Sequence, residues 1–446
     1  MLAYYSLLVN SPSLAQKNLL TDTFFCRKMG GYMKQSNLFT KTTREAPRDE
    51  MSRNAIWLTR AGYIHKEMAG VYSYLPMGLR VIEKIEKIVR EAMNKIGGQE
   101  VLLSALHPKE NWEKTGRWET MTDLYKVRDT SDKEFALGPT HEEIITPLVA
   151  SQINSYQDLP FSTYQFQTKF RSELRAKSGI LRGREFIMKD LYSFHRDETD
   201  LDNFYKLVGE SYQEIFKVVG IGDQTIHTLA SGGTFSKFSH EFQTLTPAGE
   251  DKIHICTKCR LGINDEIIAE HKVCPSCGSA DRTTETGIEV GNTFKLGTRF
   301  STPFELNYRD EKGEMKPVIM GCYGLGITRL MGAMVEVLAD DAGLIWPEAV
   351  APFRAHLVSL GAEKDAEVMK QATEVYNLLT QAGIEVFWDD RPLAAGVKLA
   401  DADLLGLPYR LVVSSRTTGK KEVEVKRRTA KEVELIPIEK LCASLG

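Results

Sequence analysis

The chain has 446 residues, of which 42% are hydrophobic and 26% charged, and its net charge is −3. This length allows two or three domains with a large core, and the composition is that of an ordinary globular protein. The charge provides no overall positive field that would draw in a nucleic acid, and no apolar run approaches the roughly 20 residues of a transmembrane helix.

Residues 1–32 contain no clear structural pattern. The first nine residues are mostly apolar, but they lack the basic stretch that begins a secretory signal. Arg27 and Lys28 are too few cations for an organellar presequence. We therefore expect a poorly defined N-terminal extension, for which a start codon assigned too early is the simplest explanation. On this basis a cytoplasmic location is favoured over a mitochondrial or other organellar one.

The first strongly periodic segment predicts a helix over residues 78–96, which ends at two glycines. The apolar face of the helix consists of Leu79, Ile82, Ile85, Ile88, Val89, Met93 and Ile96.

Further on, Thr140-His-Glu142-Glu leads into an apolar run. Taken by itself, this pattern is typical of a helix start with acids in its first turn.

The segment over residues 164–171 alternates strictly between apolar and polar side chains. It predicts a half-buried strand whose open polar face ends in the cation Arg171. A loop at Ser178-Gly179 and a second strand over 185–194 complete a hairpin. An arginine fixed on a strand suits an oxyanion such as phosphate, because its planar fork gives bidentate hydrogen bonds. The alternative interpretation is a solvated, charged hairpin.

Apolar residues over 200–219 recur with the spacing of a helix.

The chain contains seven cysteines that follow no disulfide pattern, and four of them form two close pairs. Two such pairs separated by 14 residues predict a zinc ribbon over residues 250–286, in which each pair forms a turn. Four thiolates leave no open coordination position, so we expect a structural zinc site; unligated thiols are the alternative. The four residues are Cys256, Cys259, Cys274 and Cys277.

A glycine-rich strand and turn over residues 320–326 leads into a helix with one apolar face. Gly324 and Gly326 would let the backbone approach a ligand closely. Arg329 falls in the first turn of this helix. It is either a surface arginine of an amphipathic helix or, beside the Arg171 hairpin, a second phosphate contact.

Residues 346–352 contain two prolines and mark a domain boundary. Beyond them the pattern alternates between strands (355–360, 384–388 and 409–413) and helices (363–382 and 397–405). This order predicts a small α/β domain with a mixed sheet.

The hairpin with Arg171, the segment with Thr140 and the segment with Arg329 together resemble the motifs of class II aminoacyl-tRNA synthetases. In detail they resemble prolyl-tRNA synthetases of the bacterial and organellar type. The Arg171 hairpin is similar to motif 2 and the Arg329 segment to motif 3. Motif 1 would be the helix over 78–96, followed by a strand that closes on His107 and Pro108. The likeness extends from about residue 33 to the C-terminus and includes long runs at 184–190, 239–242 and 321–326.

The resemblance implies that proline is activated with ATP to prolyl-adenylate and is then transferred to the 3′ end of tRNA(Pro). Arg171 and Arg329 would be catalytic: Arg171 would bridge the proline carboxylate and the α-phosphate, and Arg329 would hold the γ-phosphate and stabilise the leaving pyrophosphate. Mg²⁺ would accompany the ATP. The other implied ATP contacts are Glu173, Arg182, Gly324 and Gly326. The implied proline contacts are Thr140 and Glu142 at the ammonium, with His240 and Cys322 beside the ring.

The implied fold is an α+β class II synthetase catalytic core, an antiparallel sheet with helices, over residues 33–346. It contains the zinc-ribbon-like insertion and is followed by a smaller α/β anticodon-binding domain over 352–446. Phe387, Trp388 and Arg391 are candidates for reading anticodon bases. A homodimer is implied and no membrane partner. The insertion is too short for the editing domain of many bacterial members, so a separate trans-editing deacylase is a candidate partner.

Three alternatives stay open. A threonyl or seryl enzyme is one, although threonyl enzymes use an active-site zinc with Cys and His ligands, unlike the cysteine cluster here. A non-catalytic accessory protein on the same scaffold would typically lack the motif arginines, which this chain has. A free-standing editing hydrolase would not need the ATP-site segments.

Overall fold

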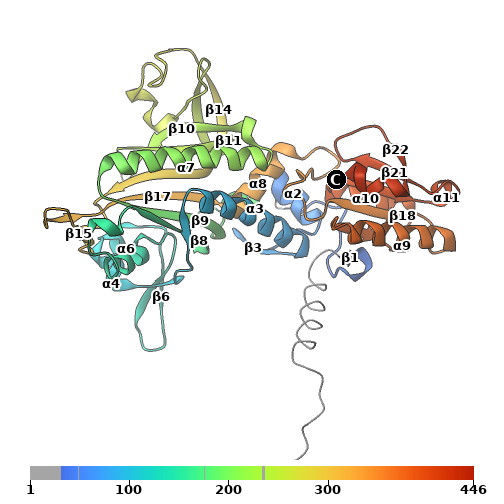
Figure 1. The fold of residues 1–446 in the computed structure, drawn as a ribbon, viewed down its shortest axis with the longest axis horizontal. Helices are drawn as coiled ribbons and strands as arrows, with labels where there is room; N and C mark the ends of the chain where they lie inside the picture. The colour runs from blue at the N-terminus through green and yellow to red at the C-terminus, as the bar shows by residue number, and fades with distance from the viewer. Residues whose placement is uncertain (1–31, 49, 175, 234–236, 446) are drawn as a thin grey trace, which may run out of the picture. The chain divides into compact units, whose positions relative to one another are not determined.

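The computed structural model describes residues 32–48, 50–174, 176–233 and 237–445. Apart from Tyr32, the expected N-terminal extension lies outside the described residues. The contacts divide the chain into two compact units (Figure 1). The larger runs from Thr40 to Pro352, and the smaller combines the residues up to Phe39 with those from Phe353 onward.

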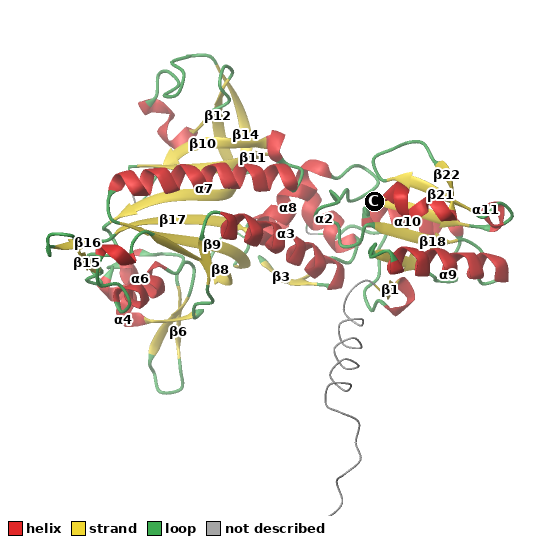
Figure 2. Cartoon of the chain, viewed as in Figure 1, coloured by secondary structure: helices red, strands yellow, loops and turns green. Residues whose placement is uncertain are grey.

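A nine-stranded sheet, counted over the described residues, forms the centre of the larger unit (Figure 2). Neighbouring strands are antiparallel except for two parallel pairs, β10 with β13 and β4 with β8. In order across the sheet the strands are β11 (Phe238–Leu245), β10 (Thr225–Ser231), β13 (Gly262–Asn264), β12 (Asp251–Cys256), β14 (Arg282–Gly297), β17 (Ile319–Gly326), β9 (Glu185–His195), β8 (Phe161–Phe170) and β4 (Gly98–Glu100).

Helices cover one face of this sheet. The long helix α7 (Glu198–Val218) packs across β14, β17 and β9, as Figure 1 shows. It contacts α3 (Pro76–Lys95), which in turn contacts α8 (Ile327–Leu338), and α8 also packs against α2 (Arg53–Arg60). The helices predicted over 78–96 and 200–219 are thus present as α3 and α7. One member of the predicted apolar face of α3, Leu79, is 46% exposed.

A second layer covers the other face of β8 and β9. It contains a small sheet of β5 (Leu106–Pro108), β7 (Glu134–Leu137) and β6 (Tyr125–Arg128), with helices α4 (Lys109–Lys114), α5 (Arg117–Thr120) and α6 (Glu142–Ala150). The side chain of Gln167 on β8 donates to the carbonyl of Leu103 in this layer, at 2.7 Å.

The second layer corrects one prediction. The polar face of β8 was expected to be open, but Gln165 and Lys169 on it are fully buried. Alternation identifies which side chains share a face, and it does not reveal whether another layer covers that face. The larger unit also contains two hairpins, β2 (Ile64–Met68) with β3 (Val71–Tyr74) and β15 (Asn307–Arg309) with β16 (Met315–Pro317).

The smaller unit is built on a six-stranded sheet, counted over the described residues, with the order β1 (Tyr32–Lys34), β19 (Val386–Asp389), β18 (Ala355–Ser359), β20 (Tyr409–Val413), β21 (Glu422–Arg427) and β22 (Glu434–Pro437). The first four strands are parallel and the last two are added antiparallel, so the predicted mixed sheet is confirmed. Its helices are α9 (Ala366–Gln381), α10 (Ala395–Leu405), α11 (Ser415–Thr418) and α12 (Leu441–Leu445).

Strand β1 lies where the N-terminal extension was expected to end and the catalytic domain, predicted from residue 33, to begin. It pairs with β19, and Asp390 just beyond β19 accepts hydrogen bonds from the backbone N–H of Ser36 at 3.1 Å and its hydroxyl at 2.8 Å. Lys34 lies over the ring of Trp388, 4.5 Å from its centroid. The N-terminal segment therefore completes the edge of the smaller unit.

Candidate active site

A cavity of about 380 Å³ lies on the face of the large sheet opposite α7. It is bounded by the end of β8, by β9, β14 and β17, by the start of α6, and by the segment around residues 120–123. The lining residues are Arg117, Thr120, Met121, Thr122, Asp123, Thr140, Glu142, Arg171, Met188, Asp190, Asn292, Phe294, Arg299, Cys322 and Gly324.

Backbone hydrogen bonds hold the walls of this cavity together at the end of β8. Phe170 donates its N–H to the carbonyl of Gly138 at 3.2 Å, and Ser172 donates to the carbonyl of Asp123 at 2.8 Å. Arg171, between them, donates to Arg184 across the hairpin at 2.9 Å. The predicted motif-2 hairpin therefore also fixes the two loops that face it.

Arg171 projects into the cavity with much of its hydrogen-bonding capacity unused. Among the described residues its buried Nε has no partner, and its Nη2 has only a long contact of 3.5 Å to the carbonyl of Pro139. The guanidinium also lies over the ring of Phe186. Burial and the nearby charge of Arg329 both lower the pKa of Arg171, although an arginine stays protonated in a protein. A half-buried cation with spare donors beside a second cation is a binding site for an anion.

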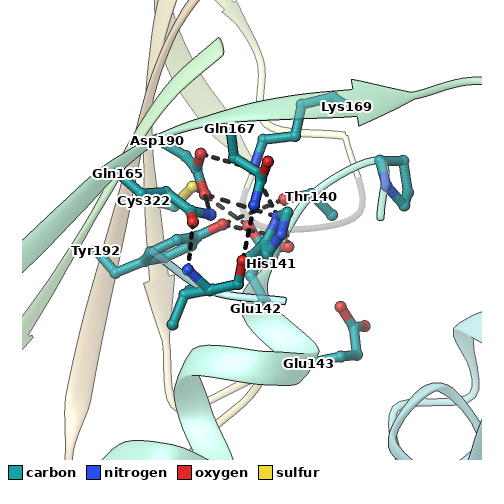
Figure 3. A network of polar contacts seen from close by, with 12 residues as sticks. Thr140, His141, Glu142, Glu143, Gln165, Gln167, Lys169, Asp190, Tyr192 and Cys322 are labelled. Atoms are coloured by element: carbon teal, nitrogen blue, oxygen red, sulfur yellow. Dashed lines mark hydrogen bonds and ion pairs between the residues drawn. The ribbon is translucent and has the colours of Figure 1, made fainter. Parts of the chain in front are cut away.

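Thr140 and Glu142 lie side by side at the start of α6. The Thr140 hydroxyl donates to Glu142 Oε2 at 2.6 Å, and the Cys322 thiol donates to Glu142 Oε1 at 3.3 Å. Arg117 Nη1 is 3.3 Å from Glu142 Oε2 and 3.0 Å from Glu143 Oε1. The buried carboxylate of Glu142 borders the cavity, so it can accept hydrogen bonds from a bound ammonium group (Figure 3).

Arg329, Glu173 and Arg182 do not line the cavity. Arg329, in the first turn of α8 as predicted, donates to the carbonyls of Leu181 and Glu289, both at 2.8 Å. Arg182 and Glu173, in the loop of the hairpin, pair with each other at 2.9 Å. Gly326 precedes α8 and is also outside the lining, whereas Gly324 lines it.

The position of Gly324 shows why glycine is needed there. A Cβ on this residue would lie 2.7 Å from Oδ1 of Asn292, which accepts the N–H of Gly324 at 3.0 Å. Asn292 also donates to Glu289, at 2.6 Å. A side chain at position 324 would therefore displace Asn292, which itself lines the cavity.

His240 does not match its predicted place beside the proline ring. It pairs with Thr293 across β11 and β14, and its Nδ1 is 2.9 Å from the hydroxyl of Tyr205 on α7. Its side chain therefore lies on the helix-covered face of the sheet, whereas Asn292 and Phe294, one position to either side of Thr293, line the cavity. Burial lowers the pKa of His240 to about 4.

Several lining residues were not singled out from the sequence, among them Arg117, Asp123, Asp190 and Arg299. Asp190 is the second carboxylate at the base of the cavity and accepts from the side chain of Gln165 at 2.9 Å (Figure 3). Its place on β9 was predictable, because alternation from Met188 puts residues 188, 190 and 192 on one face. Arg117, on the short helix α5, has no comparable sequence signal.

The four cysteines form one cluster, with all four Sγ atoms within 4.8 Å of one another. Both pairs make the same turn: Arg260 donates to the carbonyl of Cys256 and Gly278 to that of Cys274, each at 2.9 Å. Tetrahedral zinc with sulfur at 2.3 Å requires sulfurs about 3.8 Å apart. The separations of 3.5 Å (Cys256–Cys277) and 3.6 Å (Cys259–Cys274) fit such an ion. The insertion that holds them is continuous with the large sheet through β12 and β13.

In the smaller unit, two candidates for base recognition are not available on the surface. Phe387 is fully buried and Trp388 is 2% exposed, so neither ring can stack on a base. Both belong to the short buried strand β19, and aromatic residues in such a strand serve the core. Arg391 is more accessible, but it is paired with Asp389 at 2.7 Å and with Asp401 at 2.8 Å.

Comparison with known protein families agrees with both units. The model of the tRNA synthetase class II core domain (G, H, P, S and T) matches residues 125–338. The model of the anticodon binding domain matches residues 349–445. Together they define the chain as a class II aminoacyl-tRNA synthetase. Among the described helices, none is both long and apolar enough to cross a bilayer.

Similar proteins narrow the family further. Proline--tRNA ligase of Syntrophomonas wolfei is 34% identical, with 91% of this chain and 97% of the relative aligned. That of Moorella thermoacetica is 32% identical, with 93% and 98% aligned. The chain belongs to the proline--tRNA ligase family. The crystal structure of prolyl-tRNA synthetase from Cryptosporidium parvum complexed with L-proline and AMP has the same fold, with a TM-score of 0.71 and 20% identity over 88% of this chain and 73% of that one.

The alignment also reveals a difference in length. It extends over 558 positions in the Syntrophomonas wolfei comparison, more than the 446 residues of this chain. More than 100 positions of the alignment therefore hold residues of the relative that have no counterpart here.

Proposed function

We propose that this chain is a proline--tRNA ligase that activates proline with ATP and transfers it to tRNA(Pro). The observation that carries the proposal is the cavity itself. It places an arginine with spare donors, Arg171, in the same space as the buried carboxylate of Glu142. Binding a zwitterionic amino acid requires both the cation and the carboxylate in the site, and binding an adenylate requires the cation.

In the first step, the proline carboxylate attacks the α-phosphorus of ATP and pyrophosphate leaves. Arg171 would contact both anions and reduce their repulsion, and the hydroxyl of Thr140 and the carboxylate of Glu142 would take the two N–H donors of the secondary ammonium. Cys322 and Phe294 would border the ring. Because no covalent enzyme intermediate is required, these residues act by positioning and by charge stabilisation.

ATP would occupy the side of the site toward α8. Arg329 would hold the outer phosphates, and Glu173 and Arg182, now paired with each other, would separate to contact the adenine and a phosphate. Mg²⁺ enters with ATP, held chiefly by phosphate oxygens and water, and neutralises charge there; we assign it no protein ligand. His240 has no role in this arrangement.

We further infer that the four cysteines hold one structural Zn²⁺, since their thiols fit a tetrahedral ion and fill every coordination position. Bound zinc would fix the tip of β12 and the turn before β14.

We also propose a homodimer through the motif-1 helix α3, whose Leu79 is exposed. Light scattering of the purified protein tests this directly.

A proline pocket rejects smaller amino acids only weakly by apolar contacts. The insertion that holds the four cysteines is too short for an editing domain, so we infer that a separate deacylase removes mischarged alanine. Stable alanyl-tRNA in a reaction of the purified enzyme would support this inference, and its rapid hydrolysis would contradict it.

The test of the main proposal is amino-acid-dependent exchange of labelled pyrophosphate into ATP, scanned over proline, alanine, cysteine, threonine and serine. Proline should give the strongest exchange, and Arg171→Ala should abolish it. Exchange with threonine or serine instead would indicate a sister enzyme. A folded protein without exchange for any of these amino acids would favour the non-catalytic accessory protein. Charging of tRNA(Pro) then tests the second step.

A further inference from the structure

Two lysines are fully buried in the middle of the large sheet, Lys169 on β8 and Lys189 on β9. A buried ammonium is costly unless hydrogen bonds and a counter-charge compensate it. The partners of each buried lysine therefore indicate what it does in the structure. Lys189 pairs across the hairpin with Phe166, three residues from Lys169, and so the two lysines point to opposite faces. Lys189 donates to the hydroxyl of Tyr212 on α7 and, at 3.0 Å, to the carbonyl of Tyr323.

Lys169 points instead toward the cavity, although it is not among the residues that line it. Its Nζ is 2.7 Å from Oδ1 of Asp190 and 2.6 Å from Nδ1 of His141, as Figure 3 shows. An ammonium has only donors, so Nδ1 of His141 must accept and the ring must be neutral, with its proton on Nε2. That nitrogen lies 3.1 Å from the carbonyl of Ser104, a suitable acceptor.

His141 separates the two residues that are proposed to bind the prolyl ammonium, Thr140 and Glu142. Its backbone N–H donates to the hydroxyl of Tyr192 at 2.9 Å, and its ring is fully buried. The ring is therefore the anchor of this short segment: if it turns, the Thr140 hydroxyl and the Glu142 carboxylate move with it.

The second partner of Lys169, Asp190, forms the opposite wall. Its other oxygen accepts from Gln165, which in turn accepts the N–H of Leu103 at 2.9 Å. One buried ammonium thus joins the recognition segment before α6 to the β9 wall of the cavity. Lys169, His141 and Asp190 lie in two of the motif segments identified from the sequence, but none of the three was assigned a role there.

We propose that Lys169 is a positioning residue for the amino-acid site, which sets the separation of Glu142 and Asp190 through His141 without touching the substrate. The proposal rests on the function proposed above. Because displacements of about 1 Å in a reacting constellation can cost about 100-fold, losing this link should impair proline binding well beyond any general loss of stability. ATP should be little affected, since in the part of the chain that the structure describes Arg329 and the hairpin loop bond to other partners and not to this network.

The experiment compares Lys169→Met with Lys189→Met in the full-length protein. Both substitutions replace a fully buried lysine of the same sheet with a side chain of similar volume, but only the first breaks the link to the cavity. Pyrophosphate exchange gives KM for proline, KM for ATP and kcat separately. Lys169→Met should raise KM for proline by about 10-fold or more and leave KM for ATP unchanged, whereas Lys189→Met should leave both unchanged.

If Lys169→Met does not fold, a second pair of variants tests the contact between Lys169 and His141. His141→Asn keeps an acceptor near the position of Nδ1, and His141→Leu removes it. The asparagine variant should retain a KM for proline closer to that of the wild type than the leucine variant does.

Three results would overturn the inference. Lys169→Met could leave KM for proline unchanged, it could change the proline and ATP constants equally, or His141→Asn could behave like His141→Leu. In each case the wild type would still exchange with proline, so the proposed function would stand. A wild type that shows no proline-dependent exchange would refute the proposed function, and the inference with it.

Discussion

The carboxylate of Glu142 provides the sharpest test of the proposed amino-acid site. Glu142→Gln keeps the shape of the side chain and its acceptor for the Thr140 hydroxyl but removes the charge that would meet the prolyl ammonium. Arg117 keeps a partner, because Glu143 Oε1 is 3.0 Å from its Nη1. A hydrogen bond to a charged group contributes about 1.5–3 kcal/mol. KM for proline should therefore rise by about 10- to 150-fold, with KM for ATP unchanged.

Glu143→Gln is the matched control for this substitution. Glu143 is equally buried and also contacts Arg117, but it does not line the cavity, and no dashed line reaches it in Figure 3. Burial raises its pKa to about 7, so a neutral side chain is already accessible there near neutral pH. Pyrophosphate exchange at varied proline measures both variants. An unchanged KM in Glu142→Gln, or an equal rise in both, would refute the assignment of Glu142 as the ammonium partner.

Three further predictions address the other sites. Arg171→Lys keeps the charge but loses the planar fork, so kcat for pyrophosphate exchange should fall by about 100-fold or more. Cys256→Ser should lose zinc, measured by plasma mass spectrometry of the dialysed protein, and should lower the melting temperature, because a structural ion contributes to folding. Burial lowers the pKa of Lys189 to about 7, so above that pH the folded chain lacks a proton that the unfolded chain still binds. Stability should therefore rise with pH from about 7 to 10, by up to about 1.4 kcal/mol per pH unit, and Lys189→Met should remove this rise in urea midpoints.

Each of these has an outcome that contradicts it. Full activity of Arg171→Lys would show that a point charge is enough for pyrophosphate exchange and that the planar fork is not required. Cys442→Ser, in the other unit, is the control for zinc, and a wild type that is free of zinc yet indifferent to added Zn²⁺ would exclude a structural ion. Parallel pH curves for wild type and Lys189→Met would show that this lysine is charged in the folded state.

The elements of the site were predictable because the pattern in each is strong. Alternation in β8 placed Gln165, Lys169 and Arg171 on one face, and the structure confirms that Gln165 and Lys169 are directed into the cavity-side network and Arg171 into the cavity. Helical spacing likewise located α3, α7 and α8. In the smaller unit, short elements separated by glycine and proline gave the right order of strands and helices.

The sequence could not show which other segments pack against each face of a strand. The layer that buries Lys169 comes from segments 19 to 63 residues earlier in the chain, and no local pattern predicts that they pack there. His240 was assigned by likeness to a motif, but the register of β11 against β14 turns it toward α7. Phe387 and Trp388 were candidates as aromatic residues near polar ones, whereas both faces of β19 are covered. Strand β1 is too short for periodicity to reveal it.

Strand β1 has a consequence for the order in which the protein can be assembled. Ser36 and the Asp390 that accepts its hydrogen bonds are 354 positions apart in the chain. On the ribosome, Ser36 must wait for this partner until residue 390 has emerged, so β1 can join the sheet only long after its own synthesis. A fragment that begins at Phe353 would expose an edge of β19, and such edges invite pairing between chains. Two stretches of the message more than 350 codons apart thus encode neighbouring strands of one sheet.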